Sequence, residues 1–349
     1  MILNFFIGSY TKMISPVFGG SGKGIYSVAL NTETGHLQVL HKTKVVNPAY
    51  LAISSNNKFL YTITEVLAKD KPKVMAFRIK DDFSLEYINE QLISGDLPCH
   101  ITYANSSVIV SCYGSGNVLQ FNVNFNGELL PFIINHKHLG KSINTKRQES
   151  AHAHQSVVLS NNKDVFVPDL GIDKLKAYVF INGKLQLNNK KDINIEQGNG
   201  PRHVVFSKNG MLGYLLNELT GNISVLKLGK DGFKSIDTYK TLPHSFAKTP
   251  SASAIRLHPN NKFLYAANRT QEAISLFKIK GEGLEFVSYT YTKGKTLREF
   301  NIAPNGKLLI ACLQDSNDVI VYKILEDGNL KELFSTQEVL SPVCITFFK

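Results

Sequence analysis

One hairpin pattern recurs along almost the whole sequence and constrains the fold more than any other feature. Each copy has a short strand of alternating apolar residues, a turn, usually Asn-Asn or Asn-Gly, and a second apolar strand. The clearest copies are NPAYLAISSNNKFLYTITE (47–65), GPRHVVFSKNGMLGYLLNE (200–218) and SASAIRLHPNNKFLYAANR (251–269). Looser copies are LPCHITYANSSVIVSCYG (97–114), HAHQSVVLSNNKDVFVPDL (152–170) and TLREFNIAPNGKLLIACLQ (296–314). Such units have to pack on one another, because a single hairpin cannot bury its apolar faces alone.

The spacing of the repeats predicts an all-β fold, a seven-bladed β-propeller. Equivalent residues of the second strands recur at intervals of 49, 56, 48, 51 and 45 residues, at Tyr61, Val110, Phe166, Tyr214, Tyr265 and Ile310. Each hairpin is followed by a third and a weaker fourth strand, so we expect four-stranded antiparallel blades. A seventh copy is split between the two ends of the chain, with its first strand in 341–348. We therefore expect one β-propeller domain over residues 1–349, closed by N- and C-terminal strands that share a blade.

Composition narrows the classes of partner. The chain has 39 Lys and Arg against 28 Asp and Glu, a net charge of +11, but its lysines are scattered singly through turns. This distribution indicates a small anionic ligand rather than nucleic acid. The four cysteines are far apart and form no CxxC pair, which argues against a zinc site or a disulfide framework. No apolar run is long enough to span a membrane, and the N-terminus lacks a basic signal region, so we expect a cytoplasmic protein.

The repeat also predicts where polar side chains gather. The first strand of a propeller blade is innermost and antiparallel to the second. The start of the first strand and the end of the second therefore lie at the same mouth of the channel. Those positions hold His154, Arg202, Arg298, Glu65, Glu218 and Arg269. Packing alone would favour small or apolar residues there, so this cluster predicts a functional site.

The segment QESAHAHQSVV (148–158) places two histidines two residues apart. In an extended strand, His152 and His154 would point to the same face. They could form a metal pair, an acid/base pair or two unrelated structural residues. A zinc site needs at least three convergent ligands, and the neighbouring arginines would repel a cation, so we predict no metal and no cofactor.

Four segments resemble successive blades of the seven-bladed lactonase family. They are ESAHAHQSVVLSNNKDVFVPDLG, GNGPRHVVFSKNGMLGYLLNEL, SAIRLHPNNKFLYAANR and REFNIAPNGKLLIACLQDSNDVIVYKI. The resemblance covers essentially the whole chain, including the opening FIGSYT and the closing SPVCITF. The family includes propeller-type 6-phosphogluconolactonases and is similar to carboxymuconate lactonizing enzymes. The resemblance implies hydrolysis of a sugar-phosphate lactone, 6-phospho-D-glucono-1,5-lactone, to 6-phosphogluconate in the pentose phosphate pathway.

The resemblance also implies site residues. It assigns catalysis to the histidine of AHAHQ, the arginine of GPRH, the glutamate of NEL and the arginine of NR, which are His154, Arg202, Glu218 and Arg269. It implies substrate binding by Arg298, His152 and Asp169. Lactone hydrolysis needs a base for water and positive charge for the oxyanion. We expect Glu218 or His154 to be the base and the arginines to hold the anion.

Other interpretations of the same residues stay open. The two histidines could be hydrogen-bonded strand ends, and Arg202 could be a structural ion pair with Glu218. We interpret Glu65 as a solvated rim residue and note that Asp169 could cap a turn. The alternative functions are a lactonase or lactonizing cycloisomerase acting on another carboxylated lactone, such as a muconolactone, and a non-catalytic binding propeller. The oligomeric state is left open.

Overall fold

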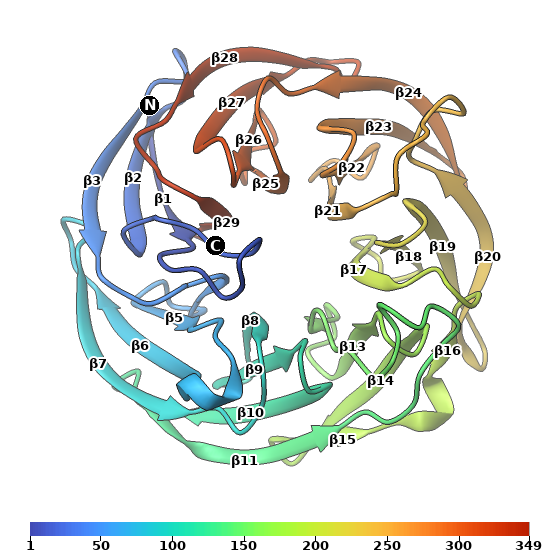
Figure 1. Ribbon diagram of the computed structural model, residues 1–349, viewed down its shortest axis with the longest axis horizontal. Helices are drawn as coiled ribbons and strands as arrows, with labels where there is room; N and C mark the ends of the chain where they lie inside the picture. Colours follow the sequence, from blue (N-terminus) through green and yellow to red (C-terminus); the bar gives the residue numbers. More distant parts are fainter. Residues whose placement is uncertain (349) are drawn as a thin grey trace.

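Seven antiparallel sheets surround a central axis in the computed structural model, which describes residues 1–348 (Figure 1). The first two complete blades are β4 (Leu51–Ile53), β5 (Phe59–Ile63), β6 (Lys73–Ile79) and β7 (Leu85–Leu92), then β8 (Pro98–Ala104), β9 (Ser107–Cys112), β10 (Asn117–Val123) and β11 (Leu129–Lys137). The next two are β12 (Val157–Val158), β13 (Asp164–Asp169), β14 (Lys174–Ile181) and β15 (Lys184–Leu187), then β17 (Pro201–Phe206), β18 (Leu212–Asn217), β19 (Asn222–Gly229) and β20 (Gly232–Lys240). The last two are β21 (Ala252–Leu257), β22 (Phe263–Asn268), β23 (Ala273–Lys280) and β24 (Gly283–Tyr291), then β25 (Leu297–Ile302), β26 (Leu308–Leu313), β27 (Asp318–Ile324) and β28 (Leu330–Thr336).

The seventh blade joins the two ends of the chain. Its strands are β29 (Pro342–Phe347), β1 (Ile2–Ser9), β2 (Ile25–Asn31) and β3 (Leu37–Thr43), in that order from the axis outward (Figure 1). The innermost strand β29 runs antiparallel to β1, with Phe5 opposite Phe347 and Gly8 opposite Cys344. The predicted seven-bladed propeller, with its shared closing blade, is confirmed.

The third blade, β12 to β15, departs from the simple four-strand pattern at both edges. Its outer strand is divided, because the helical turn η2 (Asn189–Lys191) separates β15 from β16 (Ile193–Asn194), and both pair with β14. Its inner strand β12 is only two residues long. His154 N donates to the carbonyl of Pro168, which has no N–H to return the bond. The regular ladder is therefore interrupted beside the AHAHQ segment.

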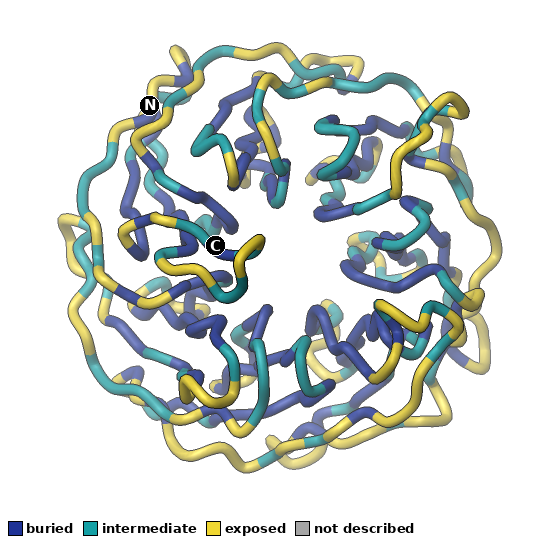
Figure 2. The backbone as a smooth tube through the Cα atoms, in the orientation of Figure 1, coloured by how far each residue is buried: buried dark blue, intermediate teal, exposed yellow. Residues whose placement is uncertain are grey.

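The core lies between blades. The second strands β9 and β26 are buried along their whole length because each sheet packs against neighbours on both faces, whereas the outer strand β11 is mostly exposed (Figure 2). Buried tyrosines of the second strands also link blades. Tyr61 donates its hydroxyl proton to the carbonyl of Gly127 at 3.2 Å, and Tyr265 donates to Gly328 at 2.7 Å. These contacts give the polar ends of the Tyr61 and Tyr265 rings a partner in the neighbouring blade.

Helical structure contributes little to residues 1–348. The segments η1 (Ala68–Asp70) and η2 are single 3-10 turns. Within those residues, neither helical segment could span a lipid bilayer.

Candidate functional site

A cavity of about 310 Å³ lies at the end of the axis where the sequence places its polar cluster. The cavity residues come from six blades and from the segment 138–156 that precedes β12. Its ionisable lining includes four arginines, two glutamates and one histidine: Arg147, Arg202, Arg269, Arg298, Glu65, Glu218 and His154. We call this cavity and its lining the charged mouth.

Irregular strand pairing aims several of these side chains. The pairing of β17 with β18 shifts register between Pro201 and His203, and that of β25 with β26 shifts between Leu297 and Glu299. The residues skipped are Arg202 and Arg298. A bulge of this kind changes the direction of a side chain relative to the regular ladder. In a regular strand, successive side chains alternate between the two faces of the sheet. The bulges in the first strands β17 and β25 instead direct Arg202 and Arg298 into the cavity.

Glu218, which directly follows β18, is the centre of an ion-pair cluster. Its Oε1 lies 2.6 Å from Arg147 Nη2, and its Oε2 lies 3.0 Å from Arg269 Nη2 and 3.1 Å from Arg202 Nε. The Glu218 side chain is 5% exposed. Burial alone would raise the pKa of Glu218, but Arg269, Arg147 and Arg202 together hold it far below its usual range. Glu218 is therefore an anion at neutral pH, and both of its oxygens are occupied by guanidinium groups.

The three arginines around Glu218 differ in accessibility. The Arg202 side chain is 5% exposed and also donates to the carbonyl of Ser253. Burial lowers the pKa of Arg202 to about 10, so it stays protonated at neutral pH. Arg269 is 17% exposed, whereas Arg147 is 41% exposed. Arg147 is thus the member of the cluster that can move with the least loss of packing.

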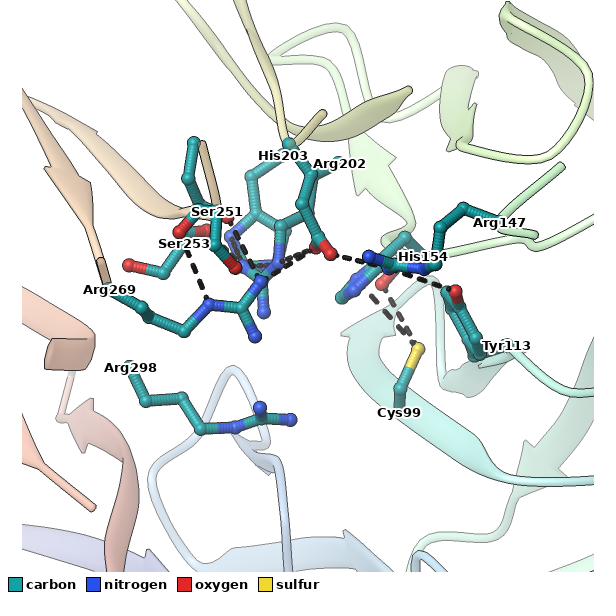
Figure 3. A network of polar contacts seen from close by, with 12 residues as sticks. Cys99, Tyr113, Arg147, His154, Arg202, His203, Ser251, Ser253, Arg269 and Arg298 are labelled. Carbon is teal, nitrogen blue, oxygen red and sulfur yellow. Dashed lines mark hydrogen bonds and ion pairs between the residues drawn. The ribbon is translucent and has the colours of Figure 1, made fainter. Parts of the chain in front are cut away.

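The sequence did not identify Arg147. It lies in the part of the segment 138–156 that precedes the repeat copy 152–170, and it donates to the Tyr113 hydroxyl at 3.2 Å as well as to Glu218. Gln148 fixes this segment, because its Nε2 donates to Leu170 O and to Asp173 Oδ2, each at 2.8 Å. Figure 3 shows Arg147 and Tyr113 approaching from the side opposite Arg269 and Arg298. The unusual length of the connection between β11 and β12 was the sequence feature that could have pointed to Arg147.

His154 is buried in the charged mouth beside a thiol. Its Nδ1 lies 3.9 Å from Cys99 Sγ, and the thiol donates to the His154 carbonyl at 3.3 Å (Figure 3). Burial, reinforced by Arg202, lowers the pKa of His154 well below its usual value. The imidazole is therefore neutral at physiological pH and can form hydrogen bonds without adding charge.

His152 and Asp169 do not line the cavity. The His152 ring stacks on Tyr113 with 4.4 Å between centroids, and its backbone N–H donates to Asp169 Oδ1 at 2.7 Å. Asp169 Oδ2 lies 2.6 Å from His138 Nδ1, and His138 Nε2 lies 2.5 Å from the Tyr178 hydroxyl. The residues His138, His152, Asp169 and Tyr178 are buried. Asp169 thus ties the backbone beside His154 to the blade, which supports the site without contacting the cavity.

The interpretation of Glu65 as a solvated rim residue is wrong. Glu65 is 4% exposed and lines the cavity. Its Oε2 accepts a hydrogen bond of 2.8 Å from the Tyr10 hydroxyl, which itself accepts one of 2.6 Å from Arg298 Nη2. The Arg298 guanidinium also lies over the rings of Tyr10 and Phe18, at 5.1 and 5.3 Å. The sequence could not show this contact, because Tyr10 and Arg298 are 288 residues apart.

Buried rings and one ion pair lie along the axis next to the charged mouth. His154 contacts His203 at 5.4 Å between ring centroids, His203 contacts His100 at 6.2 Å, and His100 contacts Tyr50 at 4.2 Å. Burial lowers the pKa of His100 to about 3. Among the described residues, no group of three or more His, Cys, Asp or Glu side chains is arranged to hold a metal ion. Burial keeps the histidines of this layer neutral. Its charged side chains are the paired Arg256 and Glu299, which lie 2.9 Å apart.

Comparison with known proteins agrees with this architecture. The family described as "Lactonase, 7-bladed beta-propeller" matches residues 4–347. The chain is 32% identical to 6-phosphogluconolactonase of Bacillus subtilis, over 98% of this chain and 97% of that protein. It is also 32% identical to 6-phosphogluconolactonase of Formosa agariphila, over 94% of each. The solved structure of a periplasmic gluconolactonase from Pseudomonas aeruginosa has a TM-score of 0.91 at 25% identity, covering 100% of this chain and 99% of that one. The chain belongs to the lactonase family of seven-bladed β-propellers.

Proposed function

We propose that the protein is a cytoplasmic enzyme that hydrolyses 6-phospho-D-glucono-1,5-lactone to 6-phosphogluconate, a step of the pentose phosphate pathway. The observation that carries the proposal is the charge of the cavity, in which four arginines face two glutamates. A ligand with a phosphate group would neutralise the excess positive charge. The names of the Bacillus and Formosa relatives support the same substrate. The four cysteines are free and buried, which fits a reducing compartment.

The arginines supply two different functions in this proposal. Arg147 is the most exposed member of the Glu218 cluster, and we assign it to the substrate phosphate, which would take the place of Glu218 as its partner. Arg202 and Arg269 are held by Glu218 and by backbone carbonyls, so they are preorganised donors. Fixed donors stabilise the oxyanion of a tetrahedral intermediate without having to reorganise. We assign them to the lactone carbonyl, beside the neutral imidazole of His154.

The size of the cavity also supports a small substrate. At about 310 Å³ it is at the lower end of the range for small-molecule sites, which is about 300–1,000 Å³. A protein partner would need a much larger surface. The small size of this cavity and its ionisable side chains therefore favour an enzyme over a binding propeller.

The test is a continuous assay with freshly generated 6-phosphogluconolactone, coupled to 6-phosphogluconate dehydrogenase, with spontaneous hydrolysis subtracted. We expect the protein to accelerate hydrolysis and the phosphorylated lactone to be preferred over glucono-1,5-lactone. Preference for the unphosphorylated lactone would assign a gluconolactonase instead. Acceleration only with a carboxylated lactone such as a muconolactone would assign the enzyme to that substrate class. If the protein accelerates hydrolysis of none of these lactones, a binding function is favoured.

A further inference from the structure

The charged mouth contains two buried glutamates in opposite environments. Both oxygens of Glu218 are engaged by three guanidinium groups. Glu65 lies in the same cavity without a salt bridge among the described residues, and its carboxylate accepts a single hydrogen bond there. Carboxyl groups of one site that are held in contrasting environments often divide the tasks of fixed charge and proton transfer.

The direction of the hydrogen bonds around Glu65 follows from the chemistry of its neighbours. A guanidinium group can only donate hydrogen bonds, so Arg298 Nη2 donates one to the Tyr10 hydroxyl oxygen. The Tyr10 hydroxyl has one proton, with which it donates a hydrogen bond to Glu65 Oε2. Oε2 is consequently an acceptor, and Oε1 has no hydrogen-bond partner within residues 1–348. The chain Arg298–Tyr10–Glu65 holds one oxygen in place and leaves the other available for a proton.

We propose that Glu65 is the general base of the reaction. This inference rests on the proposed lactone hydrolysis. A water molecule adds to the lactone carbonyl carbon as its proton passes to the Glu65 carboxylate, which forms a tetrahedral oxyanion. The bond from that carbon to the ring oxygen then breaks, and the proton held by Glu65 passes to the ring oxygen. The products are the hydroxy acid and the regenerated carboxylate, so atoms and charge balance.

The other basic groups of the cavity are less suited to this step. A carboxylate held by three arginines has little affinity for a proton, which excludes Glu218 from efficient base catalysis. The His154 imidazole is buried next to Arg202 and resists taking up a proton. Burial raises the pKa of Glu65 above its usual value, although Arg298, the Tyr10 hydrogen bond and Arg202 oppose this effect. Cys99, which lines the same cavity, is a neutral thiol, because burial raises the pKa of its thiol as well.

The test compares Glu65→Gln with Glu86→Gln, which removes an exposed carboxylate on β7. We expect Glu65→Gln to lower kcat by about 10²- to 10⁴-fold with little change in the affinity for 6-phosphogluconate measured by calorimetry. Glu86→Gln should retain the wild-type kcat. An active Glu65→Gln variant with kcat within threefold of the wild type would overturn the proposal. A wild type that accelerates no lactone would instead remove the proposed function itself, and the role of Glu65 with it.

The pH profile separates proton transfer from a structural role. The wild-type kcat/KM should fall as the pH drops through the pKa of Glu65, because the protonated carboxyl cannot accept a proton. Tyr10→Phe removes a hydrogen bond that stabilises the carboxylate, so it should move this acid limb to higher pH. The limb should be lost from the residual activity of Glu65→Gln. An acid limb that is unmoved in Tyr10→Phe, or that persists in Glu65→Gln, would contradict the assignment.

Discussion

The two ends of the propeller axis differ in both size and charge. The charged mouth is a cavity of about 310 Å³ lined by four arginines and two glutamates. The other end has a larger cavity of about 660 Å³, whose described lining includes no Asp, Glu, Lys or Arg. Its residues come from the first strands β8 and β12 and from the turns between first and second strands, such as Ser55, Asn56, Asn105 and Asn162, and we call it the turn mouth.

The difference shows that residue chemistry marks the site better than volume does. Residues at the turn mouth satisfy the needs of hairpins. Asn105 and Asn162 have positive φ angles of 49° and 53°, a conformation that asparagine tolerates better than most residues. No hairpin requires buried arginines at the charged mouth, and burying them is costly without partners. Their presence at that end therefore reflects function more than folding.

The largest effect expected from breaking this contrast is on catalysis. Arg269→Ala should lower kcat by about 10²- to 10³-fold, because it removes a preorganised donor from the oxyanion. The matched change at the turn mouth is Thr102→Ala, which should leave kcat and KM unchanged. The coupled lactonase assay measures both. A loss of activity from Thr102→Ala in a fully folded protein would indicate that the wrong end has been assigned.

The second effect is on stability and its pH dependence. Glu218→Gln should lower the free energy of unfolding at pH 7 by about 3 kcal/mol, because it leaves buried guanidinium groups without their counter-ion. The folded-state pKa of Glu218 is depressed, so its contribution is full above the usual value of 4.5 and is lost as the pH falls below it. The gap between wild type and variant should therefore be smaller at pH 3.5 than at pH 7.

Urea unfolding at both pH values measures this gap. Glu86→Gln is again the control, since an exposed carboxylate contributes little. A gap that widens on acidification would contradict a depressed pKa for Glu218.

The smallest expected effect is on recognition of the substrate phosphate within the charged mouth. Arg147→Gln should raise KM for the phosphorylated lactone by about tenfold, close to the loss of one charge-assisted hydrogen bond, and should change kcat much less. Its KM for glucono-1,5-lactone should hardly change, because that substrate has no phosphate. Steady-state kinetics with both lactones tests this. An equal rise in KM for both would remove Arg147 from phosphate recognition.

The sequence predicted those features that depend on the regular repeat. The hairpin period specified the number of blades and the shared closing blade. Antiparallel pairing then brought Arg202, Glu218 and Arg269 to one end, since each occupies a fixed position in its repeat. These predictions needed only local pattern and pairing geometry.

Features that depend on contacts between distant segments were not predictable in the same way. Arg147 reaches the cavity from an insertion, and Glu65 is buried by a tyrosine and an arginine from the closing blade and its neighbour. Asp169 faces away from the cavity because it accepts from His152 N and pairs with His138, contacts set by the interrupted ladder near Pro168. Side-chain direction at such irregular backbone depends on tertiary contacts that a sequence pattern does not contain.

The most direct measurement of the central claim is a crystal structure of the protein soaked with 6-phosphogluconate. The account predicts the product in the charged mouth, with its phosphate on Arg147 and its carboxylate against Arg202 and Arg269. Product bound only at the turn mouth, or no bound product at a concentration that saturates the enzyme in solution, would contradict it.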